Sequence, residues 1–422
     1  MSNSNNLKKK ICVVGLGYVG FPLLFELSKS FNVLGFDISQ DRIDELKKGI
    51  DKTNEVNLKR YGLSSIRLSS STRSLNTSDF YIVTVPTPIN RHNQPDLEPL
   101  RNASRIVGRS LNAGDIVVFE STVFPGATEE FCVPILENES GLKLNKDFSV
   151  GYSPERINPG DKKRKLSNIK KVVSGSNLKV SKIINNLYSE IITAGTYIAP
   201  SIKVAEASKI IENVQRDVNI SLMNEFAIIF EKLDLDTKEV LDAASTKWNF
   251  LNFKPGLVGG HCIGVDPYYL AYKSEKSGYK PKVLLNGRKV NNNISKNIFK
   301  SIQKQCINSE IDLKKCRILI LGITFKENCS DIRNSRVINL YNHFKKLNNN
   351  IDVYDPYADK NEVYQFSGIK LIDKIIKKYE VVILAVAHDQ FLEIDYKNIL
   401  NENYVLYDVK SILPKKLITL RL

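Results

Sequence analysis

The sequence predicts an α/β protein with two doubly wound domains joined by a long central helix. Short β-branched runs alternate with amphipathic stretches near both ends of the chain, as expected of βαβ units that build parallel sheets. Between these regions, residues 202–233 contain no proline or glycine, and their apolar residues recur at spacings of three and four. A length of 422 residues allows two or three domains, at about 150 residues per domain.

The expected elements follow one another along the chain. We expect strands in the first region at residues 11–14, 33–36, 80–85, 116–120, 148–152 and 171–174. The segment 202–233 should form one helix, and a loop rich in glycine, proline and aromatic residues follows at 247–269. A second α/β region begins at residue 317 and continues through strands near 351–356, 381–386 and 404–408. We therefore expect three domains, residues 1–200, 201–310 and 311–422.

Composition excludes several classes of protein. No apolar stretch approaches the roughly 20 residues of a membrane span, and the polar N-terminus lacks a signal-peptide core, so we expect a soluble cytoplasmic protein. The six cysteines form no CxxC pair, which argues against disulfides and a zinc site, and no metal is expected. The net charge of +15 comes from lysines spread along the chain, which favours an anionic small substrate, or simply solvated surfaces, over nucleic acid.

A glycine-rich turn follows the first expected strand. Gly15, Gly17 and Gly20 have the spacing of a dinucleotide-binding turn, where they allow a tight turn, close approach of a pyrophosphate, and packing of helix against strand. Asp37 ends the second strand about twenty residues later, where a carboxylate can bind ribose hydroxyls and would repel the extra phosphate of NADP. This context predicts a Rossmann-like domain that binds NAD; the alternative is a strand-to-helix turn without a cofactor.

Two further segments end expected strands at the same sheet edge. They are residues 85–88, Val-Pro-Thr-Pro, and residues 120–126, Glu-Ser-Thr-Val-Phe-Pro-Gly. Open α/β sheets bind ligands at the carboxyl ends of their strands, so these segments should line the cofactor cleft. The alternative interpretation is that the prolines only stop the strands.

A cysteine on the glycine-rich loop is the candidate nucleophile. Cys262 follows Gly259 and Gly260, and such a loop can wrap a ligand and leave a thiol accessible, whereas a typical cysteine is buried. Its neighbour His261 suggests a dyad, although adjacent side chains seldom meet. The remaining candidates include Glu155, just past a strand end, and a lysine and asparagine four residues apart on one helix face, Lys209 and Asn213.

Taken in order, these motifs resemble the UDP-glucose/GDP-mannose dehydrogenase family over nearly the whole chain. The resemblance rests on GxGYVG, VPTP, ESTVxPG, SPER, KxxxN, GGHC and LGxxFK. Residues 246–250 and 253–270 look like the branch that acts on UDP-N-acetylhexosamines, bacterial enzymes that make uronic acids for capsule or O-antigen. The resemblance implies an NAD-binding Rossmann domain, a central helical domain with a dimer interface and the cysteine loop, and a Rossmann-like UDP-sugar-binding domain, assembled as a homodimer or larger homo-oligomer.

The resemblance also implies a four-electron oxidation of the sugar C6 hydroxymethyl to a carboxylate. Cys262 would attack the intermediate aldehyde, and the thiohemiacetal would become a thioester that water hydrolyses. Lys209, with Asn213 and Asp266, would stabilise oxyanion character, while Glu155 and Thr122 would position or activate water. The implied cofactor-binding residues are Gly15, Gly17, Tyr18, Val19, Gly20, Asp37, Arg42, Pro86, Thr87, Thr122 and Lys326. The implied substrate-binding residues are Glu155, Arg156, Lys209, Asn213, Lys254, Gly256, Gly259, Gly260, His261, Phe325 and Lys326, with Arg333 as a further helper.

Three positions depart from family patterns. Ser153 and Pro159 replace an asparagine and a glutamate of the glucose-type members, which weakens a UDP-glucose assignment. Lys410 stands where many relatives have arginine, so a bidentate contact with the substrate is lost there. UDP-glucose and UDP-ManNAc remain alternative substrates to UDP-GlcNAc or UDP-GalNAc. A two-electron dehydrogenase of the 6-phosphogluconate type, or a non-catalytic binding protein, is the alternative activity.

Overall fold

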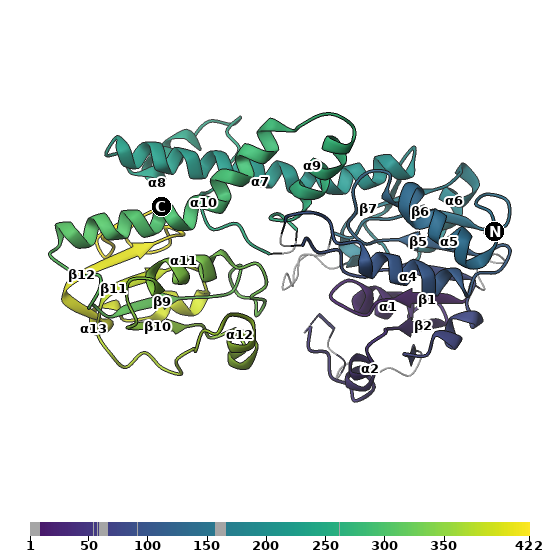
Figure 1. The fold of residues 1–422 in the computed structure, drawn as a ribbon, viewed down its shortest axis with the longest axis horizontal. Helices are drawn as coiled ribbons and strands as arrows, with labels where there is room; N and C mark the ends of the chain where they lie inside the picture. Colours follow the sequence, from purple (N-terminus) through teal and green to yellow (C-terminus); the bar gives the residue numbers. More distant parts are fainter. Residues whose placement is uncertain are drawn as a thin grey trace. The chain divides into compact units, whose positions relative to one another are not determined.

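The computed structural model describes residues 9–53, 55–56, 58, 66–90, 92–156, 166–260 and 262–422. Two positions singled out in the sequence, Pro159 and His261, lie outside these residues. The chain divides into two compact units. Unit 1 contains Met1–Glu212 and Tyr268–Gly278, and unit 2 contains Asn213–Pro267 and Tyr279–Leu422. Each unit contains one sheet covered by helices (Figure 1).

Unit 1 is built on an eight-stranded sheet within the described residues, in the order β3-β2-β1-β4-β5-β6-β7-β8. Neighbouring strands are parallel except for β6 and β7. The order reverses between β1 and β4, which is where open α/β sheets bind their ligands. The strands are β1 (Ile11–Val14), β2 (Val33–Phe36), β3 (Ile66–Ser69), β4 (Phe80–Val83), β5 (Ile116–Phe119), β6 (Ser149–Tyr152), β7 (Lys171–Gly175) and β8 (Thr196–Ile198).

Helices cover the sheet of unit 1 because its central strands are apolar on both faces. Ile82 of β4 and Val118 of β5 belong to one buried cluster with Leu23 of α1 and Ile184 of α6. The helices are α1 (Gly20–Leu27), α2 (Gln40–Lys47), α4 (Glu98–Gly108), α5 (Val133–Ser140) and α6 (Leu178–Ser189). Short 3-10 helices lie at η1 (Thr72–Thr77) and η3 (Leu166–Asn168), and a short π-helix lies at η2 (Thr128–Cys132).

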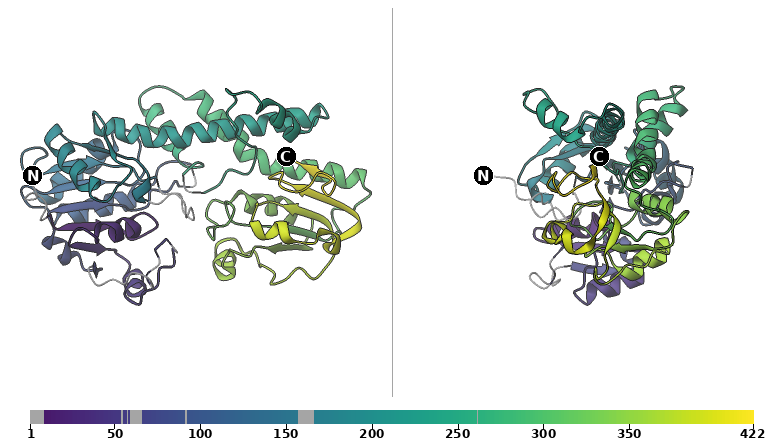
Figure 2. Two further views of the ribbon diagram at one scale, coloured as in Figure 1. Left: turned by 180° about the vertical axis from the view of Figure 1, so that it is seen from behind. Right: turned by 90° about the vertical axis from the view of Figure 1, so that its left-hand side faces the viewer.

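The long central helix predicted from the sequence is α7 (Ile202–Lys232), which ends one residue earlier than expected. Figure 2 shows it from behind as one unbroken helix. It begins within unit 1 and continues into the residues of unit 2. The helices that follow are α8 (Thr237–Ala244), α9 (Asp266–Lys276) and α10 (Lys282–Asn308).

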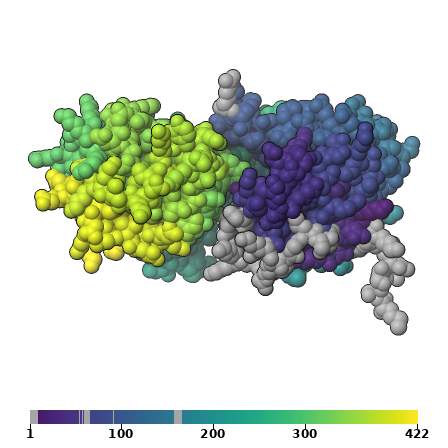
Figure 3. Space-filling model, turned by 90° about the horizontal axis from the view of Figure 1, so that it is seen from below, coloured from purple at the N-terminus to yellow at the C-terminus, as the bar shows by residue number. Residues whose placement is uncertain are grey.

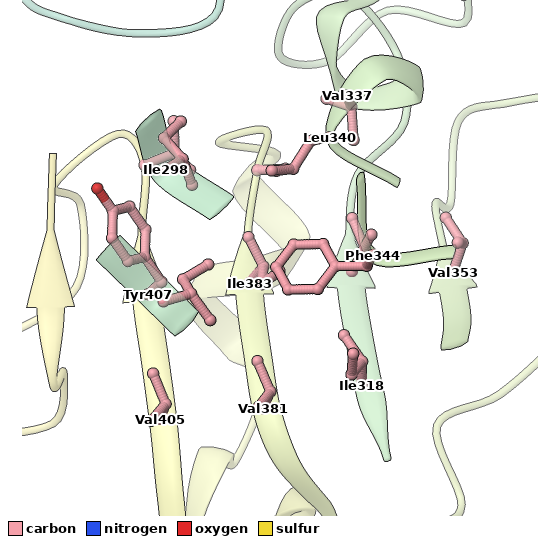
Figure 4. Packing of buried hydrophobic residues seen from close by; sticks show 14 of the residues in the cluster. Ile298, Ile318, Val337, Leu340, Phe344, Val353, Val381, Ile383, Val405 and Tyr407 are labelled. Carbon is pink, nitrogen blue, oxygen red and sulfur yellow. The ribbon is translucent and has the colours of Figure 1, made fainter. Parts of the chain in front are cut away.

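Unit 2 contains a five-stranded parallel sheet in the order β10-β9-β11-β12-β13, counted over the described residues. Ile318 and Ile383 pack in one buried cluster with residues of α10 and α11 (Figure 4). Leu319 belongs to a second cluster, because successive side chains of a strand point to opposite faces of the sheet. Figure 3 shows the C-terminal part of this unit, coloured yellow-green to yellow, on one face of the molecule. The elements are β9 (Ile318–Leu321), α11 (Arg336–Lys345), β10 (Ile351–Tyr354), α12 (Lys360–Ser367), β11 (Tyr379–Leu384), η4 (Asp389–Glu393), α13 (Tyr396–Ile399), β12 (Leu400–Asp408) and β13 (Leu420–Arg421).

The predicted fold class is confirmed, and the differences lie at sheet edges and strand ends. The sequence did not indicate β3, β8 or β13, because these are short edge strands that are half-buried or exposed and so lack an apolar pattern. The predicted strand 80–85 was too long, since β4 ends at Val83 and the side chain of Thr84 instead donates to the carbonyl of Gly15 at 2.7 Å.

Candidate active site

The glycine turn of unit 1 has the geometry of a phosphate-binding turn. Gly15 adopts φ +95°, which L side chains rarely adopt. A Cβ on Gly20 would lie 1.8 Å from the carbonyl oxygen of Gly15, so any larger residue would push α1 off the strand. Gly17 is exposed and has nothing within 4 Å of a Cβ position, and Val19, at the N-cap position of α1, makes no side-chain capping hydrogen bond. A pyrophosphate can therefore approach this turn and the helix N-terminus.

Asp37 and Arg42 hydrogen-bond to the backbone of this turn. The carboxylate of half-buried Asp37 accepts hydrogen bonds from the amides of Leu16 at 2.8 Å and Ser39 at 2.9 Å. Arg42 donates to the carbonyl of Leu16 at 2.9 Å and forms ion pairs with two carboxylates, Glu45 at 2.6 Å and Asp51 at 2.8 Å. These contacts fix the backbone of the turn beside the Asp37 carboxylate.

The two proline-containing segments meet at the sheet edge of unit 1, as the sequence predicted for residues at the ends of neighbouring strands. Ser121 donates to the carbonyl of Val85 at 2.6 Å, which links them directly. The segment of residues 120–126 is also held by Glu206 of α7. The Glu206 carboxylate accepts hydrogen bonds from the amides of Gly126 at 2.5 Å and Thr128 at 2.8 Å. Burial raises the pKa of Glu206 to about 7. Of the predicted cofactor contacts, Pro86 is exposed, and Thr87 and Thr122 are half-buried.

A buried ionic cluster surrounds the candidate Glu155. The ammonium of Lys171 lies 3.0 Å from a Glu155 oxygen and 3.1 Å from a Glu120 oxygen, and Tyr188 donates to the other oxygen of Glu120. Burial raises the pKa of Glu120 to about 7. Burial lowers the pKa of Lys171, but its two carboxylate partners outweigh this effect and raise it. Sequence reasoning missed Glu120 and Lys171 as site residues, although a lysine at the start of a buried strand was the available signal.

Arg156 reaches the helix that carries Lys209. Its guanidinium donates to the backbone carbonyls of Ser208 at 3.0 Å and Lys209 at 3.1 Å, and it pairs with Glu212 at 2.7 Å. Lys209 itself is 5% exposed. Unit 1 therefore brings Arg156 and Lys209 together, with the arginine bound to the backbone of α7.

The candidate nucleophile Cys262 is exposed, whereas the five other cysteines are buried. Its carbonyl accepts hydrogen bonds from the amides of Val265 at 3.0 Å and Asp266 at 2.8 Å, which anchors the cysteine directly before α9. The side chain of Asn213 donates to the buried Asp266 carboxylate at 2.6 Å. Unit 2 thus brings together Cys262, Asp266 and Asn213, three residues that the sequence predicted for one site.

The backbone of the cysteine loop is held by a buried polar network. Asn224 of α7 accepts the amide of Gly256 at 2.8 Å and donates to the carbonyl of Gly256 at 3.1 Å. It also donates to Asn291 of α10 at 2.8 Å, and Asn291 donates to Asp217, which pairs with Arg288. Sequence reasoning missed this network, because polar residues on long helices show no pattern that separates buried from exposed faces.

The LGxxFK loop of unit 2 packs against Gly259 and Gly260 of the cysteine loop. A Cβ on Gly260 would lie 2.8 Å from the ring of Phe325, and a Cβ on Gly259 would lie 2.6 Å from the carbonyl of Asn334. The side chain of Lys410 is close to Gly256, with its ammonium 3.2 Å from a Cβ built there. Of the remaining predicted contacts, Lys326 is half-buried beside the Phe325 ring, Arg333 pairs with Asp331 at 2.7 Å, and Lys254 is exposed.

The described residues contain neither a cluster suited to a metal ion nor a helix suited to a membrane. No group of three or more His, Cys, Asp or Glu side chains in the described ranges is arranged to hold a metal ion. Among the helices of the described chain, none combines the length and the apolar character needed to cross a membrane.

Three family models match consecutive parts of the chain. They are the NAD binding domain of the UDP-glucose/GDP-mannose dehydrogenase family at residues 9–192, its central domain at 203–293 and its UDP binding domain at 319–415. The chain belongs to this family.

Two curated proteins and a solved structure resemble the chain over nearly its full length. Protein CapL of Staphylococcus aureus is 52% identical, covering 96% of this chain and 97% of that protein. The UDP-N-acetyl-D-glucosamine 6-dehydrogenase of Salmonella typhi is 51% identical, covering 98% of each. The solved structure of UDP-D-ManNAc dehydrogenase from Pyrococcus horikoshii has a TM-score of 0.89 at 26% identity, covering 98% of each chain.

As a member of this family, the protein is an NAD-dependent dehydrogenase, and its residues fit that cofactor. The open space at Gly17 and the uncapped start of α1 suit a pyrophosphate. The Asp37 carboxylate at the end of β2 suits ribose hydroxyls and disfavours a 2′-phosphate.

Proposed function

We propose that this chain is a UDP-N-acetyl-D-glucosamine 6-dehydrogenase, which oxidises the C6 hydroxymethyl of the sugar to a carboxylate. The relative with that name is 51% identical over nearly both chains, whereas the solved UDP-D-ManNAc dehydrogenase is 26% identical. This difference favours the GlcNAc epimer over the ManNAc epimer, and similarity to Protein CapL supports a role in surface polysaccharide synthesis. We further propose a cytoplasmic location and a homodimer or larger homo-oligomer.

The observation that carries the chemistry is the exposed thiol of Cys262 on a loop of fixed backbone. Bound NAD would accept one hydride in each of the two oxidation steps. We infer that the Cys262 sulfur attacks the aldehyde carbon after the first oxidation and forms a thiohemiacetal. Loss of the remaining C6 hydride gives a thioester, and attack by water releases the carboxylate and restores the thiol.

Further polar residues are proposed to support these steps. Asn213 and Asp266 hydrogen-bond to each other in unit 2, an arrangement that suits them to orienting water. We propose that the Lys209 ammonium stabilises the alkoxide and tetrahedral oxyanions as they develop. Glu155 is held by Lys171, so its carboxylate is suited to orienting a water by accepting a hydrogen bond, with Thr122 as a second contact.

The remaining assignments follow from the family motifs. We propose three domains at residues 1–200, 201–310 and 311–422. We propose that Gly15, Gly17, Tyr18, Val19, Gly20, Asp37, Arg42, Pro86, Thr87, Thr122 and Lys326 bind NAD. We propose that Glu155, Arg156, Lys209, Asn213, Lys254, Gly256, Gly259, Gly260, His261, Phe325 and Lys326 bind the UDP-sugar.

Counting NADH per sugar tests this function. Purified protein is mixed with NAD and UDP-GlcNAc, UDP-GalNAc, UDP-ManNAc or UDP-glucose, and NADH formed is compared with sugar consumed. Two NADH per UDP-GlcNAc, with the highest kcat/KM for that sugar, is the expected result. One NADH would indicate a simple two-electron dehydrogenase, and none with any sugar would indicate a binding protein.

Cys262→Ser tests the covalent step. We expect this variant to lose the second oxidation, because a serine hydroxyl is a far weaker nucleophile than a thiolate. The matched control is Cys316→Ser in the core of unit 2, where the thiol donates to the carbonyl of Leu313 at 3.7 Å and a hydroxyl can replace it. Turnover of Cys262→Ser at the rate of the control would rule out the covalent route.

A further inference from the structure

Unit 2 contains a buried histidine that none of the proposed steps uses. His388 has no exposed surface and lies shortly after β11, while Asp355 directly follows β10. Strand β9, which leads into the loop of residues 322–328, lies between these two strands in the sheet. The carboxyl ends of the three parallel strands therefore meet at one edge.

Asp355 binds the beginning of this loop. Its Oδ2 accepts the amide hydrogens of Ile323 at 2.7 Å and Thr324 at 3.2 Å. Its Oδ1 accepts the amides of Tyr357 at 2.8 Å and Ala358 at 3.1 Å, which fixes the carboxylate in turn. Buried backbone amides that meet a carboxylate form strong, charge-assisted hydrogen bonds.

His388 binds the end of the loop. Its Nδ1 accepts the amide hydrogen of Asn328 at 2.9 Å, so the ring proton belongs on Nε2. Nε2 lies 3.1 Å from Asp355 Oδ2 and 3.2 Å from the hydroxyl oxygen of Thr324. That hydroxyl donates to the carbonyl of Lys326 at 2.9 Å. The loop is thus bound at its start, its middle and its end by one connected set of side chains.

The ring of His388 cannot turn away easily. Tyr357 and Phe391 pack on it, with ring centroids 4.8 and 5.1 Å away. A buried polar network of this kind is rigid when every member has a partner, and it loosens when one partner is removed.

We propose that His388 and Asp355 are positioning residues for the nucleotide sugar: they hold the 322–328 loop so that Phe325 and Lys326 present a preformed UDP-binding surface. This proposal rests on the proposed function, since it takes Phe325 and Lys326 as substrate contacts. The loop also touches the cysteine loop through Phe325 and Gly260, so the same pair stabilises both segments. A purely structural role would affect folding and leave UDP affinity unchanged.

Two substitutions separate the two bonds of His388. In His388→Asn the amide oxygen can replace Nδ1 and keep the bond to Asn328, while the contact with Asp355 is lost. In His388→Gln the amide nitrogen can replace Nε2 and keep the contact with Asp355, while the bond to Asn328 is lost. The matched control is His343→Asn, which changes a half-buried histidine of α11 that packs on Phe299.

Isothermal titration of the full chain with UDP alone, and separately with NAD, measures the effect. We expect each His388 variant to bind UDP about tenfold more weakly, as befits the loss of one buried hydrogen bond. NAD affinity should fall less, because all proposed NAD contacts except Lys326 lie in unit 1. His343→Asn should bind both ligands like the unmodified chain. The KM for the UDP-sugar should rise more than kcat falls.

The outcomes distinguish this proposal from the proposed function. If both His388 variants melt at lower temperature and still bind UDP with the original affinity, the positioning role is wrong. If the unmodified chain fails to oxidise UDP-GlcNAc while the variants lose UDP affinity, the proposed substrate is wrong and the positioning role stands. Failure of the unmodified chain to bind UDP would overturn both.

Discussion

Replacing Lys171 by methionine should destabilise unit 1 strongly, because it leaves two buried carboxylates without their cation. Lys171 is 3% exposed and lies 3.0 and 3.1 Å from oxygens of Glu155 and Glu120. Removing one partner from a buried ion pair costs about 3–5 kcal/mol. For a domain of this size a loss of 1 kcal/mol lowers the melting temperature by about 2–4 °C, so the expected drop is about 6–20 °C.

The loss of stability in Lys171→Met should increase as the pH rises. Glu120 has a pKa raised to about 7 from 4.5, and removing Lys171 raises it further. A group whose pKa is raised on folding stabilises the protein below its unfolded pKa, and this stabilisation is lost as pH rises through the folded pKa. The drop in melting temperature of Lys171→Met should therefore be larger at pH 8 than at pH 5.

Thermal melting of Lys171→Met and of a neighbouring control tests this reasoning. Lys170 is exposed and precedes Lys171 in the chain, so Lys170→Met changes the same residue type outside the cluster. The control should melt within about 2 °C of the unmodified protein, as surface substitutions usually do. If Lys171→Met melts like the control at pH 8, the cluster does not contribute to stability as argued.

Two further predictions concern the loops of the candidate site. Asn224→Ala removes both hydrogen bonds to the Gly256 backbone, so we expect kcat/KM for the UDP-sugar to fall about tenfold or more. The control is Asn219→Ala, whose amide donates to the carbonyl of Gln215 in the same helix. Equal kcat/KM values of the two variants would contradict a role of Asn224 in holding the cysteine loop. Glu206, with a pKa raised from 4.5 to about 7 by burial, should stabilise the fold at low pH and lose that contribution as pH rises to about 7. Melting temperatures from pH 5 to 8 should consequently fall less for Glu206→Gln than for the unmodified protein, and an identical slope would refute the assignment.

The sequence predicted the elements whose side chains repeat regularly. The long helix, the glycine turn and most central strands were located to within about two residues, because burial imposes a period of 3.6 or 2 and tight turns require glycine. The exception is β12, which begins at Leu400, four residues before the expected start. Edge strands such as β3 and β8 escaped prediction, since a partly exposed strand has no such period. The exposed Cys262 was recognisable from its glycine-rich neighbours and from the order of motifs along the chain.

The sequence by itself therefore determined the fold class, the family and most of the residues proposed for chemistry. Only the tertiary structure decided which polar residues meet: Lys171 with Glu155, 16 residues apart, and His388 with Asp355, 33 residues apart. Lys171 meets Glu155 because β7 runs antiparallel to β6, so the start of β7 lies beside the end of β6. His388 meets Asp355 because the carboxyl ends of the parallel strands β10, β9 and β11 lie at one edge of the sheet. A single sequence carries no record of that adjacency, whereas the local backbone requirements of a turn or a helix are visible in the residues themselves.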